Sequence, residues 1–199
     1  MKNIAVLVLA AGKSSRMKSI KQLEKINNKT LVDIALEKIK YIVPNNIFCV
    51  LGANSDKIRQ EIITENIKFI NNKNFEKGLS SSIVAGIQHF KKNELTFDGV
   101  FILLADQPAI EILYLKNMID LFEKNSNTII ASNYGTKLGV PAIIPKKYFE
   151  DLLLIKADKG AKEFINKRKS EVLCPRIATN LFDIDTKEDL MLFKNSIFK

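Results

Sequence analysis

The chain has 199 residues, of which 46% are hydrophobic, a composition typical of a globular protein and not of a disordered chain. Its formal net charge is +9, but the lysines are spread along the chain without the aromatic residues or motif spacings of nucleic-acid-binding proteins, so we expect no nucleic-acid partner. No apolar stretch reaches the roughly 18 residues of a membrane span, and the first residues lack the pattern of a signal peptide, so we also expect no membrane partner.

Apolar runs alternate with amphipathic segments along the chain. The apolar runs predict strands at 4–10, 47–51, 67–70, 100–104, 128–131, 142–144 and 181–184. The segments between them predict helices at 30–42, 55–64, 80–91, 111–124, 146–155, 159–168 and 186–195. Strands joined by helices form right-handed crossovers, so the pattern predicts a single α/β domain over residues 1–199 with a mostly parallel central sheet. Cys49 and Cys174 fit no metal or redox spacing, which predicts reduced thiols in a cytoplasmic protein.

The first predicted strand, 4–10, is a continuous run of apolar residues, typical of a strand buried on both faces. It leads into a turn of small residues, Ala11-Gly12-Lys13-Ser14, whose backbone N–H groups can approach a phosphate, and Arg16 and Lys21 add positive charge. The turn is not a Walker A motif, because a leucine stands five residues before Gly12, and no further glycine completes a dinucleotide fingerprint. We therefore predict a phosphate-binding loop of another kind.

Acidic residues follow two predicted strands, at the edge of the sheet where ligands bind. Asp106 comes directly after the strand 100–104, where its carboxylate can hold Mg²⁺ against phosphates; a turn or helix-cap aspartate is the alternative. Asp183 and Asp185 alternate at the end of the strand 181–184, so both can face one cation. The alternative is that Asp185 or Thr186 caps the following helix.

The segment Gly78-Leu79-Ser80-Ser81-Ser82 opens the predicted helix 80–91 with three hydroxyl groups. Free N–H groups and hydroxyls at a helix N-terminus suit the recognition of an anion or a carbonyl. Plain N-capping is the alternative, although one serine is enough for it. His89 lies alone within this helix, so we expect it to pack or to face solvent rather than to catalyse.

Five segments recur together in the order of a known family, from residue 9 to residue 190. They are Leu9-Ala10-Ala11-Gly12-x-Ser14-x-Arg16-Met17-x-x-x-Lys21-x-Leu23, the serine segment, Asp106-Gln107-Pro108, Gly139-Val140-Pro141-Ala142 and Asp183-Ile184-Asp185-Thr186-Lys187-Glu188-Asp189-Leu190. This set resembles the MobA-like nucleotidyltransferases, in particular the molybdenum cofactor cytidylyltransferases. The resemblance implies a Rossmann-like three-layer sandwich of the nucleotide-diphospho-sugar transferase type.

The resemblance also implies an activity: Mg²⁺-dependent transfer of CMP from CTP to the terminal phosphate of molybdopterin, with release of pyrophosphate. Asp106 and Asp185 would hold Mg²⁺, Arg16 the β- and γ-phosphates, and Lys21 the charge at the α-phosphate. The acceptor phosphate is already an anion, so the reaction needs no general base. The residues implied to bind the nucleotide are Leu9, Ala10, Ala11, Gly12, Lys13, Ser80, Ser81 and Ser82.

The choice of nucleotide depends on the loop sequence. Relatives with Leu-Ala-Ala-Gly tend toward pyrimidines, whereas guanylyltransferases of the family carry Leu-Ala-Gly-Gly, so Ala11 favours CTP. A guanylyltransferase that uses GTP, a cytidylyltransferase with another phosphorylated acceptor, and a pterin carrier without chemistry are the alternatives. Transient contact with a recipient molybdenum hydroxylase is also expected. Lys18 and Ala157 stand where many relatives have glycine, which bears on loop geometry.

Overall fold

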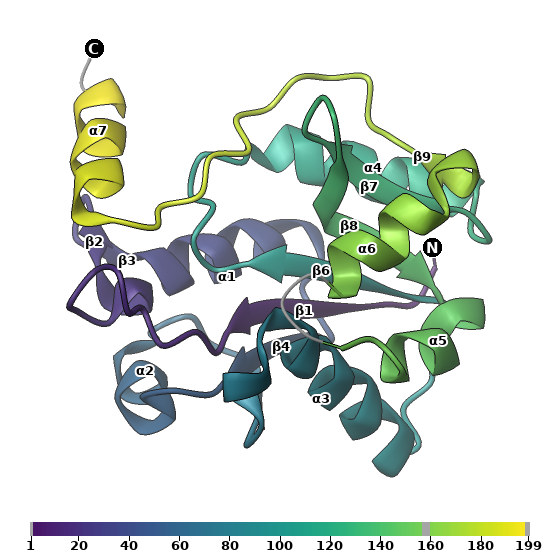
Figure 1. Cartoon of the computed structure of the whole chain (residues 1–199), viewed down its shortest axis with the longest axis horizontal. Coiled ribbons are helices and arrows are strands. Elements are labelled where there is room, and N and C mark those ends of the chain that lie inside the picture. The colour runs from purple at the N-terminus through teal and green to yellow at the C-terminus, as the bar shows by residue number, and fades with distance from the viewer. Residues whose placement is uncertain (1, 157–159, 198–199) are drawn as a thin grey trace.

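A computed structural model describes residues 2–156 and 160–197 (Figure 1). Its centre is a seven-stranded sheet with the order β5-β4-β1-β6-β8-β7-β9. The strands of this sheet are β1 (Ile4–Ala10), β4 (Ile47–Leu51), β5 (Lys68–Asn71), β6 (Gly99–Leu104), β7 (Ile129–Asn133), β8 (Leu138–Pro145) and β9 (Val172–Leu173). Strands β5, β4, β1 and β6 pair in parallel, whereas β8 is antiparallel to both β6 and β7. The predicted α/β class with a mostly parallel sheet is confirmed.

Helices cover both faces of the sheet. They are α1 (Leu31–Ile42), α2 (Ser55–Glu61), α3 (Leu79–Lys92), α4 (Ile112–Lys124), α5 (Phe149–Leu153), α6 (Gly160–Lys167) and α7 (Lys187–Ile197). Side chains of α1 and α4 pack on one face, and those of α3, α5 and α6 pack on the other, which gives the three layers seen in Figure 1. None of the helices in the described ranges is long and apolar enough to cross a membrane.

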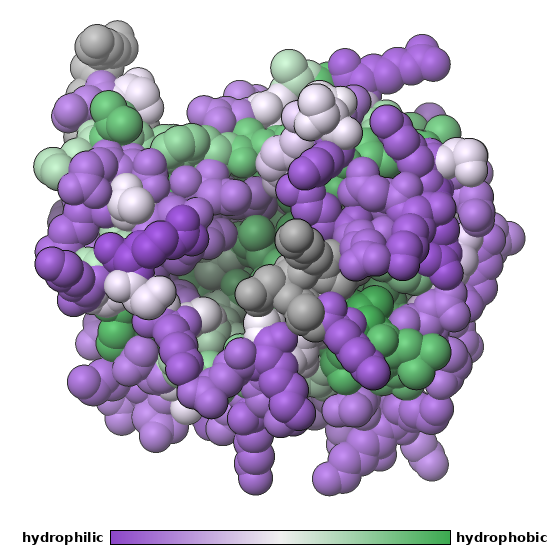
Figure 2. All heavy atoms as spheres, viewed as in Figure 1, coloured by the Kyte–Doolittle hydropathy of each residue, from purple (hydrophilic) through white to green (hydrophobic). Residues whose placement is uncertain are grey.

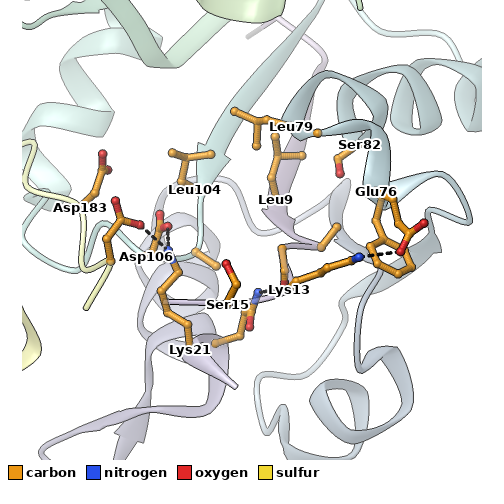
Figure 3. Close-up of a pocket in the computed structure, with 17 residues that line it drawn as sticks. Leu9, Lys13, Ser15, Lys21, Glu76, Leu79, Ser82, Leu104, Asp106 and Asp183 are labelled. Carbon is orange, nitrogen blue, oxygen red and sulfur yellow. Dashed lines mark hydrogen bonds and ion pairs between the residues drawn. The ribbon is translucent and has the colours of Figure 1, made fainter. Parts of the chain in front are cut away.

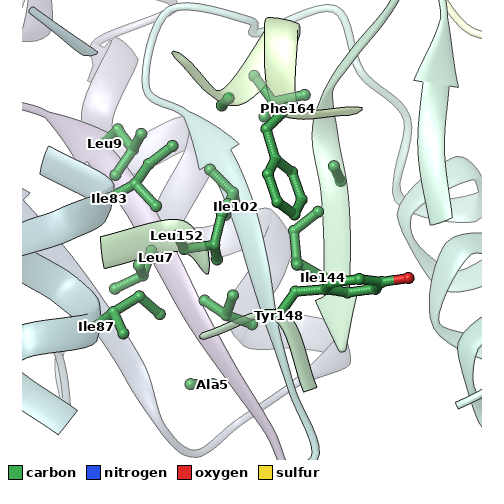
Figure 4. Close-up of a cluster of buried hydrophobic side chains, with 14 of the residues drawn as sticks. Ala5, Leu7, Leu9, Ile83, Ile87, Ile102, Ile144, Tyr148, Leu152 and Phe164 are labelled. Atoms are coloured by element: carbon green, nitrogen blue, oxygen red, sulfur yellow. The ribbon is translucent and has the colours of Figure 1, made fainter. Parts of the chain in front are cut away.

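Strand β1 shows why the sheet needs both layers, because all seven of its residues are buried. Ala5, Leu7 and Leu9 point into the cluster under α3, together with Ile83 and Ile87 (Figure 4). The alternate residues of β1 point into the cluster under α1 and α4. Successive side chains of a strand point to opposite faces, so an unbroken apolar run is what a two-sided core requires.

Helix α1 is fixed at its start by a buried aspartate. Thr30 caps the helix, since its hydroxyl accepts a hydrogen bond from the backbone N–H of Asp33. The Asp33 carboxylate, only 1% exposed, accepts hydrogen bonds from Thr30 Oγ1, from the N–H groups of Ile63 and Thr64, and from Thr64 Oγ1. This network ties the first turn of α1 to the chain that follows α2.

The structure departs from the predicted elements at the edges of the fold. The predicted strand 181–184 is wrong: this segment is irregular and makes no ladder, although the Ile184 N–H donates to the Asp106 carbonyl at 2.9 Å. The predicted helix 146–155 divides into a 3-10 turn, Lys146–Tyr148, and the short helix α5. The short strand β9 and the hairpin of β2 (Lys25–Ile26) and β3 (Lys29–Thr30) were not predicted. Ala157 lies outside the described residues.

Candidate active site

A cavity of about 520 Å³ lies at the carboxyl ends of β1 and β6. The face of the molecule drawn in Figure 2 has a hollow near its middle, with hydrophobic residues visible inside it and hydrophilic side chains to its left. The lining comes from the loops after β1 and β6, the turn before α3 and the segment before α7. It comprises Leu9, Ala11, Gly12, Lys13, Ser15, Lys21, Gln22, Phe75, Glu76, Gly78, Leu79, Ser82, Leu104, Ala105, Asp106, Asp183 and Asp185.

One end of the cavity holds a cluster of opposite charges (Figure 3). The Lys21 ammonium lies 2.5 Å from Asp106 Oδ2 and 2.9 Å from Asp185 Oδ1, so it bridges two carboxylates from distant parts of the chain. Arg16 Nη2 lies 3.0 Å from the other oxygen of Asp185. The structure therefore brings together the four residues that the sequence predicts to be catalytic. Arg16 itself is not part of the cavity lining.

The protonation of this cluster follows from burial and charge. Burial pulls the pKa of Lys21 down, but the ion pairs with Asp106 and Asp185 outweigh it and leave this pKa above its ordinary value. Desolvation of the Asp183 carboxyl, together with the negative charges of Asp106 and Asp185, raises the pKa of Asp183 to about 6. Lys21 is thus a protonated cation between Asp106 and Asp185. Asp183, a third carboxyl group with a raised pKa, lies beside them.

Helix α7 positions Asp185 although no strand carries it. The N–H groups of Asp185 and Thr186 donate to Asp189 Oδ2, and Thr186 Oγ1 accepts from the Asp189 N–H, which is the reciprocal arrangement of a capping box. Leu190 of α7 packs with Met17. Because Thr186 and Asp189 form the cap, the Asp185 side chain remains available to Lys21 and Arg16. The structure therefore contains both the helix cap and the carboxylate cluster, which the sequence offered as alternatives.

The loop after β1 is held from inside by a residue that sequence reasoning missed. Gln22 is 4% exposed, and its Nε2 donates to the carbonyl oxygens of Ala10 and Gly12, each at 3.1 Å. Its Oε1 accepts from Ser14 Oγ at 3.1 Å. Of the predicted nucleotide-binding residues, Leu9, Ala11, Gly12 and Lys13 line the cavity, whereas Ala10 contributes its carbonyl to Gln22.

The other end of the cavity is built from the 3-10 turn Phe75–Lys77 and the start of α3. Lys13 reaches across to this turn: its Nζ is 2.6 Å from Glu76 Oε1 and 5.8 Å from the centre of the Phe75 ring (Figure 3). Leu79 and Ser82 lie above this pair. The cavity thus has an ionic end at β6 and a mixed apolar and polar end at α3.

The three serines do not act alike. Ser82 lines the cavity, but Ser80 and Ser81 line a second hollow on the other side of the first turn of α3. Asn72, directly after β5, donates through Nδ2 to the hydroxyls of Ser81 and Ser82 and is itself 2% exposed. The Ser81 hydroxyl also donates to the Gly78 carbonyl. Part of the serine run therefore fixes the helix start rather than facing the cavity.

The remaining lining residues carry little sequence signal. Their only sequence signal for a place in the site is that they stand close to a motif. Three of them precede the serine run (Phe75, Glu76 and Leu79), and two precede Asp106 (Leu104 and Ala105). Gly52 supports the loop from behind, because a Cβ there would lie 2.8 Å from the Ala11 carbonyl oxygen and 2.6 Å from Phe75 Cβ. No local pattern marks such a close approach.

The carboxylates offer ligands for a divalent cation. Asp106 Oδ1 is buried and, within the described residues, has no hydrogen-bond partner. Hard cations such as Mg²⁺ prefer carboxylate oxygens, so an unpartnered oxygen beside a second carboxylate, that of Asp185, fits such an ion. Over residues 2–156 and 160–197, no three or more His, Cys, Asp or Glu side chains gather as a ready ligand set. The ammonium of Lys21 instead bridges Asp106 and Asp185.

The chain matches a family of nucleotidyltransferases. Residues 6–172 match the model of the MobA-like NTP transferase domain, and the chain belongs to this family. The bifunctional protein GlmU of Francisella philomiragia is 30% identical over 119 residues, which cover 59% of this chain but only 25% of that protein. The chain thus spans a minor part of the length of this curated relative.

Solved structures share the fold over almost the whole chain. Rv0371c of Mycobacterium tuberculosis in complex with manganese is 20% identical, with a TM-score of 0.81 and coverage of 98% of this chain and 99% of that one. The 4-diphosphocytidyl-2C-methyl-D-erythritol synthase of Anaerococcus prevotii is 16% identical, with a TM-score of 0.75 and coverage of 100% and 97%. At these identities the likeness is one of fold.

Proposed function

We propose that this nucleotidyltransferase transfers CMP from CTP to the terminal phosphate of molybdopterin and releases pyrophosphate. The observation that carries the proposal is the meeting of Lys21, Asp106 and Asp185 in the same cavity as the loop residues Ala11 to Lys13. The loop offers backbone N–H groups to phosphates, and the cluster offers the charges that a phosphoryl transfer must neutralise.

The reaction is a displacement at the α-phosphorus. An oxygen of the acceptor phosphate forms a bond to the α-phosphorus of CTP, the bond to the bridging oxygen of the β-phosphate breaks, and pyrophosphate leaves with the electron pair. The attacking oxygen carries a negative charge, so no residue needs to remove a proton. Lys21 stabilises the charge that builds up on the α-phosphate, and Arg16 holds the β- and γ-phosphates.

Magnesium is the proposed metal, and Asp106 and Asp185 are its proposed ligands. The unpartnered, buried oxygen of Asp106 supports this choice, as does the manganese complex of the structural neighbour from M. tuberculosis. When bound, the ion would supply charge neutralisation to the triphosphate and the acceptor phosphate. Arg16 and Lys21 act on the same phosphates from the side of the β1 loop.

The preference for CTP rests on the loop and on the end of the cavity at α3. Ala11 adds a methyl group where a glycine would leave more room, which favours the smaller pyrimidine ring. The likeness to a synthase whose product carries a diphosphocytidyl group agrees with cytosine recognition on this fold. The proposed nucleotide-binding residues that line the cavity are Leu9, Ala11, Gly12, Lys13 and Ser82.

The test is pyrophosphate release with Mg²⁺ and molybdopterin in four parallel reactions with CTP, GTP, UTP and ATP. Release with CTP that requires the pterin is the expected result. Release chiefly with GTP would make the chain a guanylyltransferase and overturn the role given to Ala11. If molybdopterin supports no release but a sugar or polyol phosphate does, the acceptor is wrong. Tight pterin binding without release from any nucleotide would point to a carrier.

A further inference from the structure

The loop after β1 has a conformation that its own residues do not favour. Ser14 has a φ of +57° and Lys18 a φ of +56°, in the left-handed region that side chains other than glycine disfavour by roughly 1–2 kcal/mol per residue. Such a conformation persists only where contacts from outside the loop hold it.

At Ser14 such contacts come from Gln22, through both ends of its side-chain amide. The two N–H bonds of Nε2 are used by the carbonyls of Ala10 and Gly12, and Oε1 receives the hydroxyl of Ser14. Ser14 Oγ in turn accepts from the backbone N–H of Lys21 at 3.0 Å. One buried amide thus connects the start of the loop, its turn, and the residue whose ammonium lies between the two carboxylates.

The direction of these bonds bears on ligand binding. In a trans peptide the C=O of one residue and the N–H of the next point in opposite directions. Because the Ala10 and Gly12 carbonyls point at Gln22, the N–H groups of Ala11 and Lys13 point away from it. Ala11 and Lys13 both line the cavity, so their N–H groups can donate to an anion bound there.

We propose that Gln22 is a positioning residue for nucleotide binding: its buried amide holds the β1 loop so that backbone N–H groups face the triphosphate. This inference rests on the proposed function, because it takes the cavity to bind a nucleoside triphosphate. Gln22 acts through the loop and not through the nucleobase of the ligand, so its contribution to affinity depends on the phosphates of the ligand.

The test measures dissociation constants for CTP and for cytidine with the Gln22→Met variant, which keeps the size of the side chain and loses its polar atoms. Without its anchor the loop must be ordered when the ligand binds, so we expect CTP to bind about 10- to 30-fold more weakly. Cytidine, which has no phosphates, should bind within about twofold of its wild-type constant. Gln88→Met is the matched control, because Gln88 is exposed on α3 and lies outside the cavity lining.

A purely structural role would move other quantities. It would lower the melting temperature and leave both dissociation constants of the folded protein unchanged, and that result would overturn the inference. If Gln22→Met does not fold, Ser14→Ala removes one arm of the same network and should weaken CTP binding about threefold, again without an effect on cytidine. Wild-type protein that binds no nucleoside triphosphate would refute the proposed function itself. Wild-type protein that binds CTP no more tightly than Gln22→Met would refute only this inference.

Discussion

The ammonium of Lys21 is the group whose removal tests the site most sharply. In Lys21→Met the side chain keeps most of its length and loses only its charge and hydrogen bonds. The wild-type ammonium lies 2.5 Å from Asp106 and 2.9 Å from Asp185, in a side chain that is 14% exposed. The variant therefore leaves two carboxylates side by side, one of which, Asp185, still pairs with Arg16.

Two magnitudes follow from this geometry. Loss of a preorganised charge at a reacting phosphate lowers kcat/KM by about 10²–10³-fold, which corresponds to about 2.7–4 kcal/mol. Breaking a fully buried ion pair costs about 3–5 kcal/mol of stability. The carboxylates here are 19% and 31% exposed, and Arg16 remains, so we expect a loss of about 1–2 kcal/mol. The activity should therefore fall far more than the stability.

The assay combines initial rates of pyrophosphate release with urea unfolding of the same samples. Lys25→Met is the matched control, since Lys25 is exposed on the β2–β3 hairpin, and it should behave like the wild type in both measurements. A kcat/KM within threefold of the wild-type value in Lys21→Met would refute the role given to this ammonium. A loss of activity that merely follows a loss of folded protein would refute it as well.

Three further predictions concern stability. Asp33→Ala should lower the free energy of unfolding by about 3 kcal/mol in urea titrations, because one buried donor, Thr30 Oγ1, and three partly buried donors of Ile63 and Thr64 lose their acceptor; an unchanged midpoint would contradict this. The free energy of unfolding of Lys18→Gly should lie within about 0.5 kcal/mol of the wild-type value, whereas that of Lys18→Val should be lower by about 1–2 kcal/mol, because residue 18 has φ +56°. An equal loss of stability in the two variants would argue against this loop conformation. The fold favours neutral Asp183, whose pKa is raised to about 6, so the contribution of this carboxyl to stability is lost as the pH rises from about 4 to about 6. The melting temperature of Asp183→Asn should therefore exceed that of the wild type at pH 8 and equal it near pH 4. A difference in melting temperature that is the same at both pH values would exclude this titration.

Much of the fold could be predicted because its signals are local. The run of apolar residues in β1 predicts a strand buried on both faces, and the structure buries every residue of it. Asp106 directly follows β6, and ligands bind at the carboxyl ends of parallel strands, so the sequence predicts that Asp106 lies in the site; the structure places it in the cavity lining. Lys18 has a left-handed φ, the conformation that glycine, the residue expected here from the family resemblance, adopts without strain.

The features that sequence reasoning missed depend on contacts between distant residues. Leu181 to Ile184 have the composition of a strand, but only one backbone bond, from Ile184 to Asp106, ties them to the β6 side of the site. A capping box and the packing of α7, not a ladder, place Asp185. Gln22 has no motif of its own, and its role depends on the carbonyls of a turn ten residues earlier.

The most direct test of the proposed function is Mg²⁺-dependent pyrophosphate release from CTP and molybdopterin by the Asp106→Asn variant. Asparagine keeps the shape of the side chain and removes the charge that pairs with Lys21 and that is proposed to hold the metal. We predict that the folded variant retains no more than about 1% of the wild-type rate at any Mg²⁺ concentration. Turnover at the wild-type rate would contradict the assignment of this cavity as the catalytic site.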